Sequence, residues 1–132
     1  ILNLDTVNNI VITNSRFLPK YILGLLNSKL ISYFTYNFIY SKAIRTMHFD
    51  GNYSGKIPIK DIPTESQRDF EAIVDRLLSL NSRLTKIGAK ETDDVKKIRN
   101  DIAELVKDLD FKIYELYDLE TGEITAIEKS YE

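Results

Sequence analysis

Basic, amide, hydroxyl and aromatic side chains are concentrated in a Gly-containing segment between Ser41 and Lys60. Lysine and arginine bind phosphates or guanine edges, asparagine can pair with adenine, and tyrosine can stack on bases or wedge between them. Loops carried by a rigid scaffold commonly present such side chains. We therefore predict a DNA-binding loop, with no catalytic residue in it, at Lys42, Arg45, Thr46, His48, Asn52, Tyr53 and Lys56.

The polar residues have other interpretations. The loop could instead be solvated, with Phe49 and Tyr53 packed on the core. Paired acids at 93–94 and at 108 and 110 fall on charged helical segments, where such residues are usually exposed and not catalytic. Residues 118–123 supply too few oxygen ligands for a calcium loop. His48 could act as a general base, but the sequence identifies no nucleophile or orienting partner for it.

Composition excludes several classes of protein and site. The chain has 132 residues, of which 43% are hydrophobic and 29% charged, as expected for a globular protein. The absence of cysteine and the single histidine exclude disulfides and ordinary zinc sites. There is no Gly-rich phosphate-binding motif and no G-x-S-x-G motif. No apolar run is long enough to cross a bilayer, and the first residues do not resemble a secretory signal, so we expect a cytoplasmic protein without a membrane partner.

Charge and aromatic residues divide unevenly along the chain. Residues 1–63 contain seven bases and three acids, a net charge of +4, whereas residues 64–132 contain eleven bases and seventeen acids, a net charge of -6. Nine of the fourteen tyrosines and phenylalanines precede Pro63. This asymmetry predicts an anionic partner for the first part and a structural or protein-binding role for the second, although small imbalances of charge are common.

The first part predicts short strands around one long helix. β-branched residues predict strands at 9–13, 44–47 and 57–59, and Pro58 favours an edge strand for the last of these. Apolar residues at spacings of three and four predict a helix from Lys20 to about Tyr40, buried on more than one side. Gly24 inside this helix predicts a close approach to a neighbouring strand.

The second part predicts an antiparallel helical hairpin. Thr64 and Gln67 fit a capping box at the start of the first helix. A heptad pattern typical of coiled coils then continues to a stop at Gly88, and the short connection to Thr92 forces the next helix to run antiparallel. The apolar positions of the pattern are Phe70, Ile73, Leu77, Leu80, Leu84, Ile87, Val95, Ile98, Ile102, Leu105 and Leu109. A short helix that folds back is predicted from about Thr121.

Three segments resemble the target-recognition domains of restriction–modification systems. The sequence YILGLLNSKLISY at 21–33 is similar to the "LLGLLNSKLISYY" helix of these domains. Residues 56–63, Gln67 and 70–78 resemble their "lPIp…Q..i..lVD.iL" passage. The segment 113–119 resembles the "I.ELYgLt.eEi..iE" tail of fused restriction–modification enzymes. The similarity continues at Glu123, Ile124, Ile127 and Glu128. The resemblance covers nearly the whole chain after about Ile10 and fits best the TaqI-like C-terminal specificity domain, which is related to type I specificity subunits.

The resemblance implies a module that reads a short sequence in double-stranded DNA, so that an adenine methyltransferase or endonuclease acts there. Catalysis would belong to another domain of the same polypeptide or to a partner subunit, where S-adenosylmethionine is the expected cofactor. The present chain lacks the Asn/Asp-Pro-Pro-Tyr/Phe tetrapeptide of methyl transfer, and we expect no cofactor or metal in it. Because it starts without methionine, we expect it to be part of a longer polypeptide that supplies strands before Ile10.

The predicted fold is α+β and mostly helical, in three units. Residues 1–63 would be the C-terminal part of a target-recognition domain, 64–118 an antiparallel hairpin that acts as a spacer, and 119–132 a short C-terminal helix. Two other functions stay open. The hairpin could serve protein–protein interaction or homodimerisation without direct DNA contact, or the chain could be an enzyme fragment that uses His48.

Overall fold

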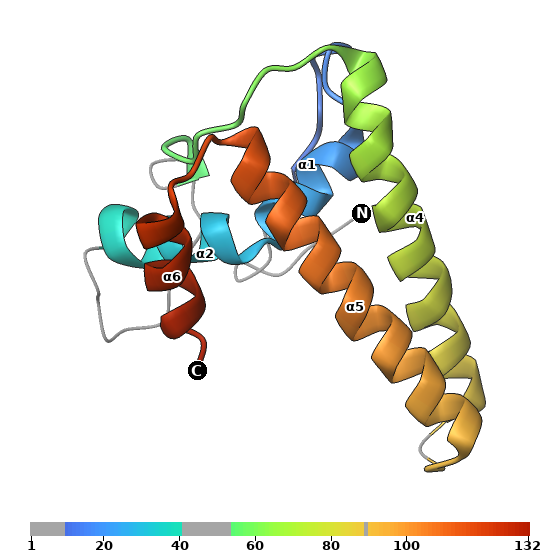
Figure 1. Ribbon diagram of the computed structural model, residues 1–132. Coiled ribbons are helices and arrows are strands. Elements are labelled where there is room, and N and C mark those ends of the chain that lie inside the picture. The colour runs from blue at the N-terminus through green and yellow to red at the C-terminus, as the bar shows by residue number, and fades with distance from the viewer. Residues whose placement is uncertain (1–9, 41–53, 89) are drawn as a thin grey trace.

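The computed structural model describes residues 10–40, 54–88 and 90–132, and these residues form helices joined by turns and extended segments (Figure 1). Among the described residues, no helix combines the length and the apolar composition needed to cross a membrane. The elements are α1 (Pro19–Leu26), α2 (Lys29–Phe34), the π-helix η1 (Thr35–Ile39), α4 (Thr64–Ile87), α5 (Asp93–Leu116) and α6 (Thr121–Lys129).

The predicted α+β class is wrong, because the described residues contain no strand. Residues 10–13 and 57–59 have no ladder pairing, and the third predicted strand, 44–47, lies outside the described residues. β-branched side chains favour extended backbone, but a strand also needs a neighbour with which to exchange hydrogen bonds. Here Ile12, Ile57 and Ile59 instead pack against the helical core, and Pro58 has no N–H to donate.

The predicted single helix from Lys20 to Tyr40 is divided at Asn27 and Ser28. Asn27 Nδ2 donates to Leu23 O, and Ser28 Oγ donates to Leu25 O, so both side chains satisfy carbonyls at the end of α1. Ser28 Oγ also accepts from Ile31 N and thereby caps α2. Asn27 and Ser28 end one helix and begin the next, because short polar side chains compete with the helical backbone.

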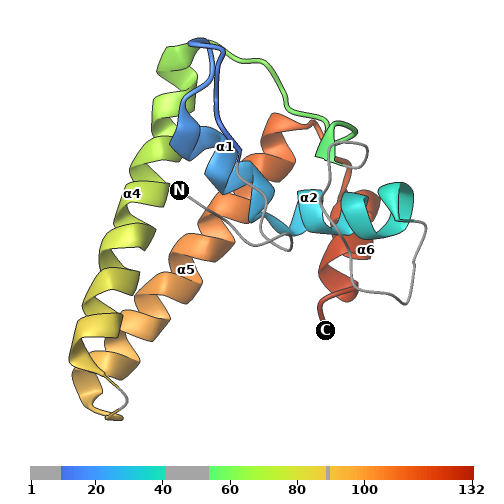
Figure 2. The ribbon, with the colours of Figure 1, turned by 180° about the vertical axis from the view of Figure 1, so that it is seen from behind.

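Helices α4 and α5 form an antiparallel pair where the heptad pattern predicts two helices (Figures 1 and 2). Gly88, with a φ of 82°, ends α4, and Thr92 Oγ1 accepts from Val95 N to cap α5. The helices are close together at their connection and diverge toward the other end, where α1 lies between them. The hairpin is therefore open at the end that carries the first part of the chain.

The core forms where α1 meets the hairpin. Its fully buried members include Tyr21 and Leu25 of α1 and Ile113 of α5, and the Tyr21 ring packs edge-on against Phe70 of α4 with 5.4 Å between centroids. Each such side chain contributes about 1.5–3 kcal/mol of burial free energy. The boundary that we predict at Pro63 lies in the extended segment before α4, and the division into three units stays a prediction.

Gly24 allows α1 to approach α4 closely. A Cβ at this position would lie 3.1 Å from Val74 Cγ2 and 3.8 Å from both methyl groups of Leu109. We predicted a close approach to a strand; the neighbour is instead a helix. The reason for a glycine at this position is the same, since a side chain would push the two helices apart.

Helix α6 folds back onto α2, as the sequence predicts a short helix from about Thr121. Glu120 and Glu123 form a capping box at its start. Near its end, Glu128 accepts from Tyr114 Oη at 2.6 Å and from Lys29 Nζ at 2.9 Å. These hydrogen bonds lower the pKa of Glu128 below its ordinary value, and burial raises the pKa of Tyr114. Glu128 therefore stays ionised at neutral pH and ties α6 to both α5 and α2.

Candidate nucleic-acid interface

Most of the predicted DNA-binding loop lies outside the described residues. The residues concerned are Lys42, Arg45, Thr46, His48, Asn52 and Tyr53. The structure places the seventh, Lys56, in an exposed turn at the start of the segment that leads to α4. Binding by all seven stays a prediction, and the described residues show how the end of the loop is held.

Two tyrosine hydroxyls fix the backbone that follows the loop. Tyr21 Oη, from α1, donates to Lys60 O at 2.7 Å. Tyr117 Oη, just after α5, donates to Pro58 O at 2.7 Å and accepts from Lys60 N at 3.1 Å. Burial raises the pKa of both tyrosines, so both hydroxyls keep their protons at neutral pH. The segment from Ile57 to Pro63 is therefore attached to the helices on both sides.

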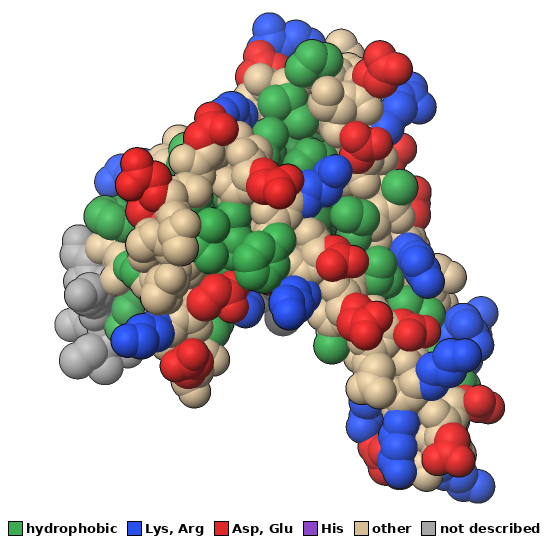
Figure 3. Space-filling view, viewed as in Figure 1, with side chains coloured by type: hydrophobic (Ala, Val, Ile, Leu, Met, Phe, Trp, Pro, Cys, Tyr) green, Lys and Arg blue, Asp and Glu red, His purple; other side chains and the backbone are tan. Residues whose placement is uncertain are grey.

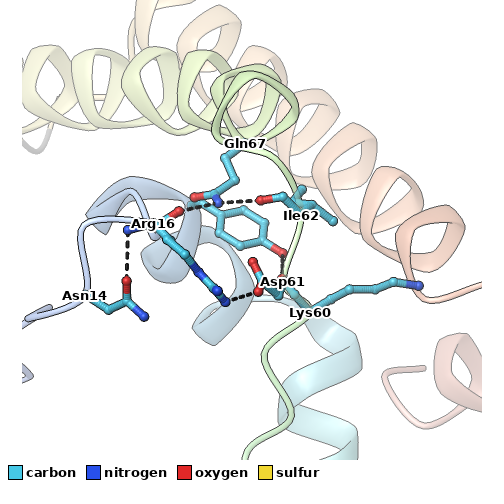
Figure 4. Close-up of polar contacts among 7 residues, drawn as sticks. Asn14, Arg16, Lys60, Asp61, Ile62 and Gln67 are labelled. Atoms are coloured by element: carbon cyan, nitrogen blue, oxygen red, sulfur yellow. Dashed lines mark hydrogen bonds and ion pairs between the residues drawn. The ribbon is translucent and has the colours of Figure 1, made fainter.

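Gln67 joins three parts of the chain through one side chain (Figure 4). It is fully buried on α4; its Oε1 accepts from Leu18 N at 2.8 Å, and its Nε2 donates to Arg16 O at 2.7 Å and to Ile62 O at 2.8 Å. The predicted capping box is wrong, because α4 begins after Pro63 without a side-chain cap and Gln67 is occupied by these backbone groups. The position of a polar residue within an apolar helical pattern was a signal of this role.

The positive charge of the first part is largely paired with acids. Four of its seven bases form ion pairs, three of them with acids that follow Pro63: Arg16–Asp61, Lys20–Asp75, Lys29–Glu128 and Lys60–Asp118. Their side chains are a third or more exposed, so each pair stabilises the fold by about 1 kcal/mol or less. Much of the charge asymmetry therefore joins the two parts of the chain.

An apolar groove of about 420 Å³ lies between residues 10–14 and the segment 54–59. The described residues that line it include Ile12, Phe17 and Ile22 but no ionisable side chain, so acid–base chemistry has no group to act there. Beside it, a hollow of about 260 Å³ reaches Thr35 of η1, whose buried Oγ1 has no hydrogen-bond partner among the described residues. The groove borders the described end of the loop at residues 54–59.

All four acids considered as catalytic pairs lie on α5. Asp110 is buried and accepts from Lys29 N at 3.0 Å, whereas Asp108 is exposed. Burial raises the pKa of Asp110. Asp93 and Asp94 occupy the first turn of α5, where acids are favoured by the helix dipole. Among the described residues, no group of three or more histidines or acids is placed to hold a metal ion.

Comparison with known proteins supports the predicted resemblance in the first part of the chain. Residues 1–59 match the family model of the TaqI-like C-terminal specificity domain. No match was found among curated proteins or among solved structures. The family match ends before α4, so the resemblance of the later segments stays a prediction. Residues 1–59 are therefore similar to the TaqI-like C-terminal specificity domain of restriction–modification enzymes.

Proposed function

We propose that this chain recognises a DNA sequence for a restriction–modification enzyme and positions an adenine methyltransferase or endonuclease on its target. The observation that carries the proposal is the match of residues 1–59 to the TaqI-like C-terminal specificity domain. The catalytic domain, in the same polypeptide or in a partner subunit, would bind S-adenosylmethionine. The present chain would determine where on the DNA the reaction takes place, and the catalytic domain would carry out the reaction.

In this proposal the loop that ends at Lys56 approaches double-stranded DNA. Lys42, Arg45 and Lys56 would neutralise phosphates, and the side chains of Thr46, His48, Asn52 and Tyr53 would contact base edges. The anchoring of the following segment by Tyr21, Tyr117 and Gln67 supports this role, because a binding loop with a fixed end loses less entropy on binding. The hairpin would set the distance to the catalytic domain.

The loop assignment can be tested by removing one charge at a time. We expect Arg45→Gln and Lys56→Gln each to weaken DNA binding and to reduce the slope of log affinity against log salt by about 0.9, since each lost phosphate contact releases one counterion fewer. Fluorescence anisotropy of a labelled duplex over a range of salt measures this slope. Lys20→Gln is the matched control, because Lys20 is paired with Asp75 on the scaffold. Unchanged slopes in both loop variants would remove the loop from the proposed interface.

A second candidate function, dimerisation through the hairpin, is supported by an exposed apolar groove. The groove measures about 420 Å³ and lies between α4 and α5 beside Gly24. On its walls Leu78 is 47% exposed, and Leu23 and Val106 are 41% exposed. Exposed apolar side chains that cluster in one place commonly mark a protein-binding surface.

Sedimentation of the chain distinguishes this candidate from DNA recognition. If the hairpin dimerises, Leu78→Asp should convert a dimer to a monomer, because a charge would be placed in the apolar interface. Ser82→Asp, at an exposed polar position of the same helix, is the control and should leave the dimer intact. A monomeric wild-type chain would exclude this candidate, and a dimer that shifts no DNA at low salt would favour it over the first.

A further inference from the structure

The free end of the hairpin is basic although the second part of the chain is acidic. This hairpin tip, residues 83–88 and 90–99, contains six bases and three acids, whereas the rest of 64–132 contains five bases and fourteen acids. All nine charged residues of the tip are exposed. Figure 3 shows lysine and arginine side chains gathered over this end of the molecule, with a few acids among them.

The acids of the tip are already engaged within the hairpin. Glu91 forms an ion pair with Arg99. Asp93 and Asp94 lie in the first turn of α5, where the positive end of the helix dipole partly offsets their charge. Five bases then form no ion pair with a described residue: Arg83, Lys86, Lys90, Lys96 and Lys97. This differs from the first part of the chain, where four bases are paired with acids.

The composition of the tip favours phosphate over protein as its partner. Four of the five unpaired bases are lysines, and lysine is depleted in protein–protein interfaces but common in contacts with the DNA backbone. The tip also has little apolar surface, with Ile87, 41% exposed, as its large exposed hydrophobic residue. Long, flexible lysine side chains can follow a row of phosphates without reading bases.

We propose that the hairpin tip is a second DNA contact, which binds backbone phosphates at a distance from the recognition loop. The inference rests on the proposed function, since it requires that the chain binds DNA. Helix α4 has 24 residues and is therefore about 36 Å long. Its first turn lies beside the anchored segment and its last turn reaches the tip (Figure 1). At 3.4 Å per base pair, the length of α4 corresponds to about ten base pairs along a duplex.

The test compares two variants that lose the same charge in different places. The tip variant combines Lys86→Gln, Lys90→Gln, Lys96→Gln and Lys97→Gln. The control variant combines Arg68→Gln, Arg76→Gln, Lys107→Gln and Lys129→Gln, which are also exposed and form no ion pair with a described residue. Binding is measured with mixed-sequence duplexes of about 40 and about 12 base pairs, because only the longer one reaches from the loop to the tip. Circular dichroism checks that both variants are folded.

On the longer duplex we expect the tip variant to lose affinity on the order of tenfold, with a salt slope lower by about 0.9 for each lost contact. The control variant should change little, and on the shorter duplex the two variants should bind alike.

A tip variant that equals the control on both duplexes, while the wild type binds them, would overturn the inference and leave the proposed function standing. If the tip variant keeps its DNA affinity but no longer binds the catalytic partner, the tip is a protein-docking surface and the inference is also overturned. A wild type that binds neither duplex at low salt would overturn the proposed function itself.

Discussion

Replacement of Gln67 by leucine is expected to lower the free energy of unfolding by about 3 kcal/mol. The two side chains are similar in volume, so the change tests hydrogen bonding and not packing. Leu18 N, Arg16 O and Ile62 O would each lose their partner, in a place where water has limited access. Each unsatisfied buried group costs about 1–3 kcal/mol. Urea denaturation followed by circular dichroism measures the effect.

Asn81→Leu is the matched control for this experiment. Asn81 is an exposed amide on the same helix, and its Nδ2 donates to Leu77 O, one turn earlier, at 2.9 Å. Its replacement should change stability by less than about 0.5 kcal/mol. A loss at Gln67 no larger than the loss at Asn81 would show that Gln67 does not hold the segments before α1 and α4 together.

Gly24→Leu is expected to destabilise the fold by about 2–3 kcal/mol. The first carbon of any side chain would already lie 3.1 Å from Val74 Cγ2, which is tighter than ordinary van der Waals contact. Val74 and the helix that carries it would have to move to make room. The loss should exceed the gain of about 1 kcal/mol that removal of a helical glycine otherwise brings.

Two further variants identify the cause of the Gly24 effect. Gly122→Ala, in α6, meets no atom within 4 Å and should leave stability unchanged or raise it slightly. Gly24→Leu combined with Val74→Ala should recover part of the loss, because the nearest contact is removed. If the double variant is as unstable as the sum of the two single variants predicts, contact with Val74 is not the reason for the glycine.

The long periodic segments were predictable from the sequence. Apolar residues from Phe70 to Ile87 and from Val95 to Leu109 repeat over many turns, so one deviation does not hide the pattern. Gly88 ends α4 through its positive φ, and Thr92 begins α5 through its side-chain cap. Such local signals do not depend on what the helices pack against.

Features that depend on distant partners were not predictable in the same way. Ser28 divides the first long helix, and its neighbour Lys29 donates its N–H to Asp110, which lies 81 positions later. Gln67 fits a local capping box, yet its partners lie in segments that only the fold brings together. The β-branched residues at 10–13 favour an extended backbone. They carry no information on whether a neighbouring strand is present, and none lies among the described residues.

The structure places only a small part of the predicted site. Six of its seven residues lie outside the described residues, and Lys56 alone has a place in the structure. The net charge of +4 in the first part overstates the positive charge that is left for an anionic partner. Lys20, Lys29 and Lys60 form ion pairs with acids that follow Pro63. Net charge counts residues but does not show which charges neutralise each other in the fold.

The central claim is that this chain reads a DNA sequence, and selection from a randomised duplex pool tests it most directly. The chain is bound to the pool at about 0.15 M salt, and the retained duplexes are sequenced after several rounds. We expect enrichment of one short sequence, and loss of this enrichment when Asn52 and Tyr53 are both replaced by alanine. Retained duplexes with no common sequence, or no retained DNA at all, would contradict the claim that the chain is a specificity module.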